Sequence, residues 1–306
     1  MIEPSFTVGL LQMACVGNKQ ANLDKAAGLV HEAAARGAQV VCLQELFSSE
    51  YFCQREDSKY FDLAEPIPGP ITNQFSDVAA QLEVVLVVPV FERRAPGVYH
   101  NAVVVIDADG QLLGHYRKTH IPDDPLYQEK FYFTPGDLGY PVFNTRFARI
   151  SPLICWDQWF PEAARLSSLG GAELLVYPSA IGWHPAERFT KGKSQHDAWL
   201  TMQRSHAIAN GVFVATTNRV GHEGPEGAGL DFWGQSFVCD PAGQILIRGS
   251  VDDEEVLLAK CHRGLIEQQR REWPFLRDRR IDSYGDLARR IRDEPDDIVS
   301  KSRTPE

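Results

Sequence analysis

A cysteine at the end of a predicted strand has the clearest chemical setting in this sequence. Cys155 follows an apolar run at residues 148–154 that is typical of a buried strand, and helix-forming residues resume at Pro161. A strand that ends in a sharp turn presents its last side chain at the edge of a sheet. Because the amides near a helix start favour a negative charge, this setting favours a thiolate. The sequence therefore predicts that Cys155 can act as a nucleophile.

Three charged residues stand in comparable places, each at the end of a predicted strand or in the loop that follows. Glu45 comes after a short apolar strand, and Lys118 comes after a predicted hairpin. Glu129 lies in the long loop beyond Lys118. Because strand ends at one edge of a sheet converge, we expect all three side chains to share a pocket with Cys155.

The chemistry that suits such a pocket is the attack of a thiolate on a planar carbonyl carbon. Glu45 would accept the thiol proton and later activate water. Lys118, with the backbone N–H of Trp156, would stabilise the negative oxygen of the tetrahedral intermediate. Glu129 would hold Lys118 in position or accept a hydrogen bond from a substrate N–H. Taken alone, each side chain is better explained as a core cysteine or a solvated charge, so it is their order along the chain that favours catalysis.

The overall composition narrows the class of partner. The 306-residue chain has a formal net charge of −10, which is a poor match for nucleic acid, because phosphate binding needs a basic face. No apolar stretch is long enough to span a membrane, and the first residues lack the pattern of a secretion signal. The six cysteines show no CxxC pair and no zinc-type spacing. We therefore expect a cytoplasmic protein with reduced thiols and without a metal, membrane or nucleic-acid partner.

The elements that must position these residues alternate between strands and helices. Residues 1–290 contain no linker-like segment and are expected to form one domain, whereas residues 291–306 are expected to be a flexible tail. Two mixed sheets, each covered by helices, satisfy this order, which predicts an α/β fold with four layers, an α-β-β-α sandwich. The predicted strands span 7–13, 40–43, 84–91, 148–154, 173–177, 212–217 and 254–260, the hairpins 101–116 and 236–247, and the helices 22–36, 71–82, 161–169, 195–209 and 263–271, with a glycine-rich loop at 221–229.

Two local signals refine these elements. Gly37 follows the first predicted helix and is a good C-terminal cap. Pro152 interrupts the strand that leads to Cys155. Because proline donates no ladder hydrogen bond, it predicts that this strand lies at a sheet edge or carries a bulge.

Three separated motifs resemble those of the nitrilase superfamily of carbon–nitrogen hydrolases. They are LQELF at 43–47, YRKTHIP at 116–122 and LICWD at 153–157, and the resemblance runs from residue 7 to about residue 287. The superfamily's glutamate, lysine and cysteine fall on Glu45, Lys118 and Cys155. Its frequent second glutamate falls on Glu129. The resemblance implies the α-β-β-α sandwich, a homo-oligomer of two or more copies, and no metal or organic cofactor.

Within this superfamily the resemblance is strongest to the amidohydrolases of N-carbamoylputrescine, a urea-capped diamine. It is carried by CWDQWFPE at 155–162, YPSAIGW at 177–183, DAW at 197–199, QRSHA at 203–207, NRVG at 218–221 and FWGQS at 232–236. This implies hydrolysis of the ureido group to putrescine, carbon dioxide and ammonia through a thioester at Cys155. The partner implied is a small cationic carbamoyl amine.

Residues next to the nucleophile also favour a cationic substrate. Relatives that hydrolyse N-carbamoyl amino acids must hold a carboxylate and tend to carry arginines there, where this chain has Gln158 and Trp159. Arg188 or Arg204 could still bind a substrate carboxylate from elsewhere in the chain.

The distal ammonium needs anionic and aromatic partners from other parts of the chain. The candidate anions are Glu187 and Asp197, and Trp159, Trp183 and Trp233 are candidate aromatic walls, although ordinary core packing explains each tryptophan equally well. We interpret the aspartates at 123–124 as a solvated turn.

Two other classes of function stay open. One is a different amidase or carbamoylase of the superfamily, such as an aliphatic amidase, a β-ureidopropionase or an N-carbamoyl-D-amino acid hydrolase. The other is a catalytically silent binding or scaffold protein. Such a protein would be expected to have lost at least one of Glu45, Lys118 and Cys155, and all three are present.

Overall fold

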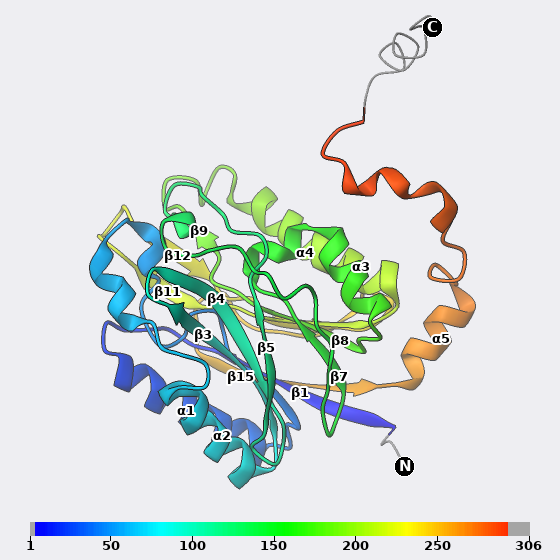
Figure 1. Ribbon diagram of the computed structural model, residues 1–306, viewed down its shortest axis with the longest axis horizontal. Coiled ribbons are helices and arrows are strands. Elements are labelled where there is room, and N and C mark those ends of the chain that lie inside the picture. Colours follow the sequence, from blue (N-terminus) through cyan, green and yellow to red (C-terminus); the bar gives the residue numbers. More distant parts are fainter. Residues whose placement is uncertain (1–3, 293–306) are drawn as a thin grey trace, which may run out of the picture.

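Two six-stranded mixed sheets pack face to face in the computed structural model, which describes residues 4–292 (Figure 1). Helices α1 (Lys19–Ala35) and α2 (Pro70–Leu82) cover the outer face of the first sheet. Helices α3 (Pro161–Leu169) and α4 (Gly192–Asn210) cover the outer face of the second. The predicted α-β-β-α sandwich is therefore confirmed. The first sheet has the order β15 (Glu255–His262), β1 (Ser5–Gln12), β2 (Val40–Cys42), β3 (Val85–Ala95), β4 (Val98–Ile106) and β5 (Leu112–Arg117). The second has the order β14 (Ile245–Arg248), β13 (Phe237–Cys239), β10 (Phe213–Thr217), β8 (Leu174–Pro178), β7 (Arg149–Pro152) and β6 (Phe143–Asn144).

Alternating side chains on the strands separate the inner and outer layers of the core. In β3, Val85 and Val87 belong to the core between the sheets, whereas Leu86 and Val88 pack against the helices. Successive side chains of a strand point to opposite faces, so a strand that is apolar throughout must be covered on both sides. This is why the predicted strand at 84–91 lies in the middle of its sheet.

The helices agree with their sequence signals and extend slightly beyond them. They are α1 (Lys19–Ala35), α2 (Pro70–Leu82), α3 (Pro161–Leu169), α4 (Gly192–Asn210) and α5 (Gly264–Glu272). Helix α1 begins three residues earlier than expected because the Asn18 side chain accepts a hydrogen bond from the Ala21 N–H. The predicted C-terminal cap is confirmed, since Gly37 adopts a φ of 92°.

The strand before Cys155 is shorter than predicted. The prediction of an edge or bulged strand was wrong, because β7 lies between β8 and β6 without a register shift. β7 ends at Pro152. It pairs in parallel with β8 on one side and antiparallel with the two-residue β6 on the other. β6 pairs with Arg149 and Ile150 only, so its ladder ends before Pro152. The missing N–H therefore removes no hydrogen bond, and the N–H of Leu153 donates to β8 instead.

A small third sheet was not predicted. It consists of three antiparallel strands, β9 (Gly182–Trp183), β12 (Leu230–Trp233) and β11 (Val220–Glu223). β11 and β12 overlap or adjoin the segment interpreted as a glycine-rich loop. The strands contain only two to four residues, too few for an alternating pattern to emerge. Gly182 permits the close approach of β9 to β12, since a Cβ there would lie 2.3 Å from the Asp231 carbonyl oxygen.

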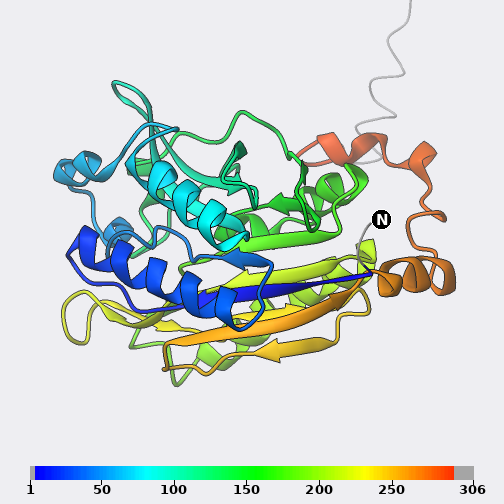
Figure 2. The same cartoon turned by 90° about the horizontal axis from the view of Figure 1, so that it is seen from below.

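The two ends of the described chain lie near the same side of the molecule. β1 and β15 pair along their whole length, so the first and last strands lie side by side (Figure 2). Beyond α5 the chain turns back toward α3 and α4, where Phe275 and Leu287 line a hollow with Arg165. Within residues 4–292, no helix is both long and apolar enough to cross a membrane. Most of the predicted tail, residues 293–306, lies outside the described residues.

Candidate active site

Cys155 sits in a sharp turn between β7 and α3, as the sequence predicted. It begins a short 3₁₀ helix, Cys155–Trp159, and its side chain is buried. Its backbone has a φ of 38°, in a region that residues with a side chain rarely adopt. Such a conformation persists only where its surroundings hold it, and it is common at catalytic turns.

Asp157 holds this turn in place, a role that we did not predict from the sequence. Its fully buried carboxylate accepts hydrogen bonds from the Ile154 N–H at 3.0 Å and the Tyr116 hydroxyl at 2.8 Å. It also accepts one from the backbone N–H of His120 at 3.0 Å. The cysteine turn is thereby tied to the chain that follows Lys118.

The resting state of Cys155 differs from the expectation of a thiolate. Burial raises the pKa of the Cys155 thiol well above its ordinary range, and the carboxylates of Glu45 and Glu129 raise it further. The Lys118 ammonium and a backbone hydrogen bond from Ala180 lower it, but by less. The short turn does not supply enough positive field to overcome desolvation. The resting thiol is therefore protonated, and attack requires a base.

Lys118 lies between the two predicted carboxylates. Its Nζ is 2.8 Å from Glu45 Oε1 and 2.6 Å from Glu129 Oε2, and all three side chains are buried. Burial would lower the pKa of Lys118, but the two carboxylates raise it well above its ordinary value. Lys118 therefore stays charged. The structure thus brings together three of the four residues that the sequence singled out, and the Cys155 thiol experiences the charge of all three.

Glu45 has one oxygen engaged and one free among the described residues. Oε1 accepts hydrogen bonds from Lys118 and, at 2.7 Å, from Asn101 Nδ2. Oε2 is buried and has no hydrogen-bond partner within the part of the chain that the structure describes. A buried carboxylate oxygen without a donor suits a group that accepts a proton during a reaction.

Glu129 is held at both oxygens. Oε1 accepts a hydrogen bond from the Tyr51 hydroxyl at 2.7 Å, and Oε2 accepts one from Lys118. Burial raises the pKa of Glu129 to about 7, against the lowering effect of Lys118 and of its two hydrogen bonds. The nearby Glu45 carboxylate adds to the rise.

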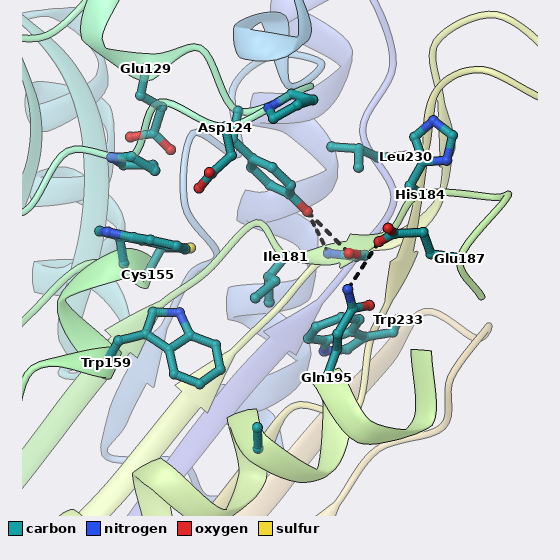
Figure 3. A pocket seen from close by; sticks show the side chains of 16 residues that line it. Asp124, Glu129, Cys155, Trp159, Ile181, His184, Glu187, Gln195, Leu230 and Trp233 are labelled. Atoms are coloured by element: carbon teal, nitrogen blue, oxygen red, sulfur yellow. Dashed lines mark hydrogen bonds between the residues drawn. The ribbon is translucent and has the colours of Figure 1, made fainter. Parts of the chain in front are cut away.

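A cavity of about 520 Å³ opens over Cys155 (Figure 3). Cys155 and Glu129 lie at one end, and Glu187 and Gln195 lie at the other. Three carboxylates reach the cavity, and none of the sixteen described residues that line it is lysine or arginine. They are Pro122, Asp124, Pro125, Tyr127, Glu129, Cys155, Trp156, Trp159, Ile181, Gly182, His184, Glu187, Gln195, Ala198, Leu230 and Trp233.

The structure places some of the predicted substrate-binding residues in this cavity and others outside it. Trp156, Trp159 and Glu187 line it. Trp183 does not; its indole N–H donates to the Gly192 carbonyl, and its ring packs behind Trp233 at 5.4 Å.

Asp197 lies on the exposed side of α4, away from the cavity. Gln195 and Ala198, three residues apart, form the cavity-facing side of this helix. A residue two positions beyond Gln195 is rotated by about 200° around the helix axis, so its side chain points away.

The argument that Gln158 and Trp159 replace carboxylate-binding arginines requires a correction. Gln158 is fully buried and faces the core, where its side-chain oxygen accepts a hydrogen bond from Trp199 Nε1 at 2.9 Å. Only Trp159 faces the cavity, so the absence of an anion clamp beside the nucleophile depends on that one position. Arg188 and Arg204 do not line the cavity either; Arg188 pairs with Asp231 at 3.5 Å.

Four polar lining residues were missed or discounted. Asp124, interpreted from the sequence as a solvated turn, is exposed but stands at the cavity wall. The Tyr127 hydroxyl accepts a hydrogen bond from the Gly182 N–H at 3.0 Å and so joins two loops. His184 and Gln195 complete the set. These residues come from loops and a helix start that only the folded chain brings together.

Within residues 4–292, no group of three or more histidine, cysteine, aspartate or glutamate side chains is arranged to hold a metal ion. All six cysteines are buried free thiols.

Comparison with known proteins identifies the family. The carbon-nitrogen hydrolase family model matches residues 7–271. An N-carbamoylputrescine amidase from Arabidopsis thaliana is 44% identical over 284 residues, covering 90% of this chain and 93% of that protein. A citrullinase from Francisella tularensis is 38% identical over 287 residues, covering 94% and 99%. The crystal structure of a carbon-nitrogen hydrolase from Helicobacter pylori G27 is 46% identical, with a TM-score of 0.91, covering 94% of this chain and all of that one.

The chain therefore belongs to the carbon-nitrogen hydrolase family of the nitrilase superfamily, as its motifs predicted. It is an enzyme that hydrolyses carbon–nitrogen bonds in amides other than peptides.

Proposed function

We propose that this enzyme hydrolyses the ureido group of N-carbamoylputrescine to give putrescine, carbon dioxide and ammonia. The observation that carries the proposal is the end of the cavity opposite Cys155, where the Glu187 carboxylate lies and where neither lysine nor arginine is among the described lining residues. Such a lining favours a substrate with a positive end and disfavours a carboxylate, which needs cationic donors. The similarity to N-carbamoylputrescine amidases over nine-tenths of the chain supports the same substrate.

In the proposed first half-reaction, Cys155 attacks the ureido carbonyl carbon. The thiol proton passes to Glu45 Oε2 as the C–S bond forms. The carbonyl oxygen gains negative charge, which the Lys118 ammonium and the backbone N–H of Trp156 stabilise. The C–N bond to the terminal NH2 group then breaks, and ammonia leaves with the proton from Glu45, so that the carbamoyl group remains on the sulfur as a thioester.

In the second half-reaction, water replaces the sulfur. Glu45 accepts a proton from water as the oxygen attacks the thioester carbon, and Cys155 leaves and regains a proton. The product carbamic acid breaks down to carbon dioxide and an amine. Glu129 keeps Lys118 beside the reacting carbonyl, because its carboxylate balances the ammonium in a dry site.

The distal ammonium of the substrate would bind Glu187, which lies at the opposite end of the cavity from Cys155 (Figure 3). Gln195 Nε2 fixes the Glu187 carboxylate at 3.0 Å, and Lys191 Nζ lies 3.2 Å from its other oxygen. Trp159 and Trp233 provide apolar walls for the four methylene groups between the two ends.

Values of kcat/KM for three ureido compounds test this proposal. N-carbamoylputrescine has only a cationic end, citrulline adds a carboxylate beside the ammonium, and N-carbamoyl-β-alanine has only a carboxylate. We expect N-carbamoylputrescine to be preferred by a factor of about 10² or more, because a buried carboxylate without donors is costly. Glu187→Gln should raise KM for N-carbamoylputrescine and leave kcat nearly unchanged. Equal or better turnover of either carboxylate substrate would contradict the proposal.

A further inference from the structure

A buried guanidinium holds the stretch of chain that carries Glu45. Arg219 is fully buried, and its Nε and Nη2 donate to the Glu45 carbonyl oxygen at 3.2 and 3.0 Å. Nη2 also donates to the Leu46 carbonyl at 2.6 Å, and Nη1 donates to the Ser49 carbonyl at 3.0 Å. Arg219 lies 174 positions after Glu45 in the sequence, and its side chain therefore binds three carbonyl groups in the distant turn after β2.

This turn needs such support. Leu46 has a φ of 50°, in the left-handed region that favours glycine. The Arg219 guanidinium binds the carbonyl groups of Leu46 and of the residue before it. A main chain in this conformation is kept there by its surroundings, and here the planar fork of one arginine provides them.

The ionic partner of this arginine reaches toward the second carboxylate. Glu223 Oε1 accepts a hydrogen bond from Arg219 Nη1 at 2.8 Å, and Oε2 accepts one from the backbone N–H of Tyr51. The hydroxyl of Tyr51 in turn donates to Glu129 Oε1. Glu223 is therefore two hydrogen bonds away from Glu129.

We propose that the Arg219–Glu223 ion pair positions both carboxylates that flank Lys118. Arg219 fixes the main chain at Glu45, and Glu223 fixes Tyr51. The hydrogen bonds of Arg219 go to main-chain carbonyl groups and to Glu223, and Glu223 binds Tyr51, so both members of the pair act through other residues. The inference rests on the proposed function in one respect, that Glu45 is the base. It also gives a role to β11, which ends at Glu223 in the small third sheet (Figure 1).

Two variants separate positioning from simple stabilisation. Arg219→Lys keeps the charge but loses the planar fork, so it cannot bind the same three carbonyl groups. Glu223→Gln keeps the shape but replaces one acceptor oxygen by a donor, which faces either Arg219 or the Tyr51 N–H. Each variant is measured for kcat and KM with N-carbamoylputrescine. The rate of Cys155 alkylation by iodoacetamide is also followed against pH, with peptide mapping to identify the modified thiol.

We expect kcat to fall by about 10²-fold in each variant with KM changed less than about twofold, because a base misplaced by about 1 Å has this effect. The midpoint of Cys155 alkylation should move to lower pH, since the Glu45 carboxylate that raises the pKa of the thiol is held less closely. Alkylation needs no carbamoyl substrate. If the wild-type enzyme fails to hydrolyse N-carbamoylputrescine but the two variants still show this shift in the alkylation midpoint, the proposed substrate is refuted and the positioning role is supported.

Glu173→Gln is the matched control. Glu173 also binds a backbone N–H, that of Arg149 at 2.9 Å, and an arginine, Arg263, at 3.3 Å. It precedes β8, at the opposite end of that strand from the cavity. This variant should lower the melting temperature and leave kcat and the alkylation midpoint unchanged. Should Arg219→Lys fail to fold by circular dichroism, Glu223→Gln decides the question. A Glu223→Gln enzyme that loses only thermal stability, as the control does, would overturn the inference.

Discussion

At the scale of single residues, the site combines a protonated thiol with an available base. Burial and the neighbouring carboxylates raise the pKa of Cys155, so the sulfur is not a thiolate at rest. Glu45 Oε2 is buried without a donor among the described residues and is the atom best suited to take the proton. Nucleophile activation therefore depends on proton transfer within the site and not on a lowered thiol pKa.

Glu45→Gln tests the assignment of the base. The amide keeps the size of the side chain and can still accept from Asn101 or Lys118, but it cannot accept a proton. We expect kcat to fall by about 10²–10⁴-fold with the fold preserved, as measured by steady-state release of ammonia and by circular dichroism. Retention of more than about a tenth of the wild-type kcat would rule out Glu45 as the base.

Tyr51→Phe tests the pH dependence that Glu129 is expected to set. Glu129 has a pKa of about 7, raised mainly by burial and lowered by its hydrogen bond from Tyr51. Below that pH the carboxyl is neutral and no longer balances Lys118, so activity should fall on the acidic side. Removing the phenol hydroxyl raises the pKa of Glu129 further, and the acidic limb of kcat/KM should move up by about one pH unit. An unmoved limb would mean that another group controls it.

At the scale of elements, the cysteine turn depends on Asp157. Its two oxygens accept from Ile154, Tyr116 and His120, and an amide in its place turns one acceptor into a donor that faces other donors. Asp157→Asn should lower the free energy of unfolding by about 1–3 kcal/mol and reduce kcat, because the left-handed Cys155 loses its support.

Thermal unfolding and steady-state kinetics check this prediction against Asp240→Ala, which removes the acceptor of a hairpin turn far from the site. Asp240 accepts two backbone N–H groups, from Ala242 and Gln244, in the hairpin turn between β13 and β14. The control should lose stability without losing kcat. Equal loss of kcat in both variants, or in neither, would contradict a special role for Asp157.

Elements with strong local signals could be predicted from the sequence, whereas the small third sheet could not. The strand before Cys155 follows from an apolar run, and the start of the next helix follows from the proline in its first turn. The strands of the third sheet are too short and rich in glycine to show a period. Local spacing likewise does not reveal that Gln158 turns into the core while Trp159 faces the cavity, because that depends on the packing of Trp199.

The catalytic residues were also easier to predict than the residues that hold them in position. Glu45, Lys118 and Cys155 each follow a strand and occur in separate motifs. Arg219 and Glu45 lie 174 positions apart, and no sequence period links them. Long-range support of this kind becomes visible only when the chain is folded.

At the scale of the whole molecule, the site lies where the two sheets meet. Glu45 and Lys118 follow strands of the first sheet, and Cys155 follows a strand of the second. The core between the sheets therefore sets the relation between base and nucleophile. A change that shifts one sheet against the other should alter catalysis before it unfolds the chain.

The outer surface suggests assembly of several copies, as the family resemblance implied. Leu166 and Leu169 on α3 and Leu287 beyond α5 are large apolar side chains exposed to solvent, and Leu287 lines a hollow with Arg165 of α3. We expect a homo-oligomer, because association would cover exposed apolar side chains of this kind. Light scattering coupled to gel filtration should give a multiple of 34.3 kDa at micromolar protein concentration. A single species of that mass would contradict the prediction.

The most direct test of the account is the release of putrescine from N-carbamoylputrescine by the wild-type enzyme and by Cys155→Ala, measured in parallel. The alanine variant lacks the attacking sulfur but leaves Glu45, Lys118 and Glu129 in place. We predict turnover by the wild type and a loss of at least about 10³-fold in the variant, with a melting temperature close to that of the wild type. A folded Cys155→Ala enzyme that still releases putrescine at the wild-type rate would contradict the central claim.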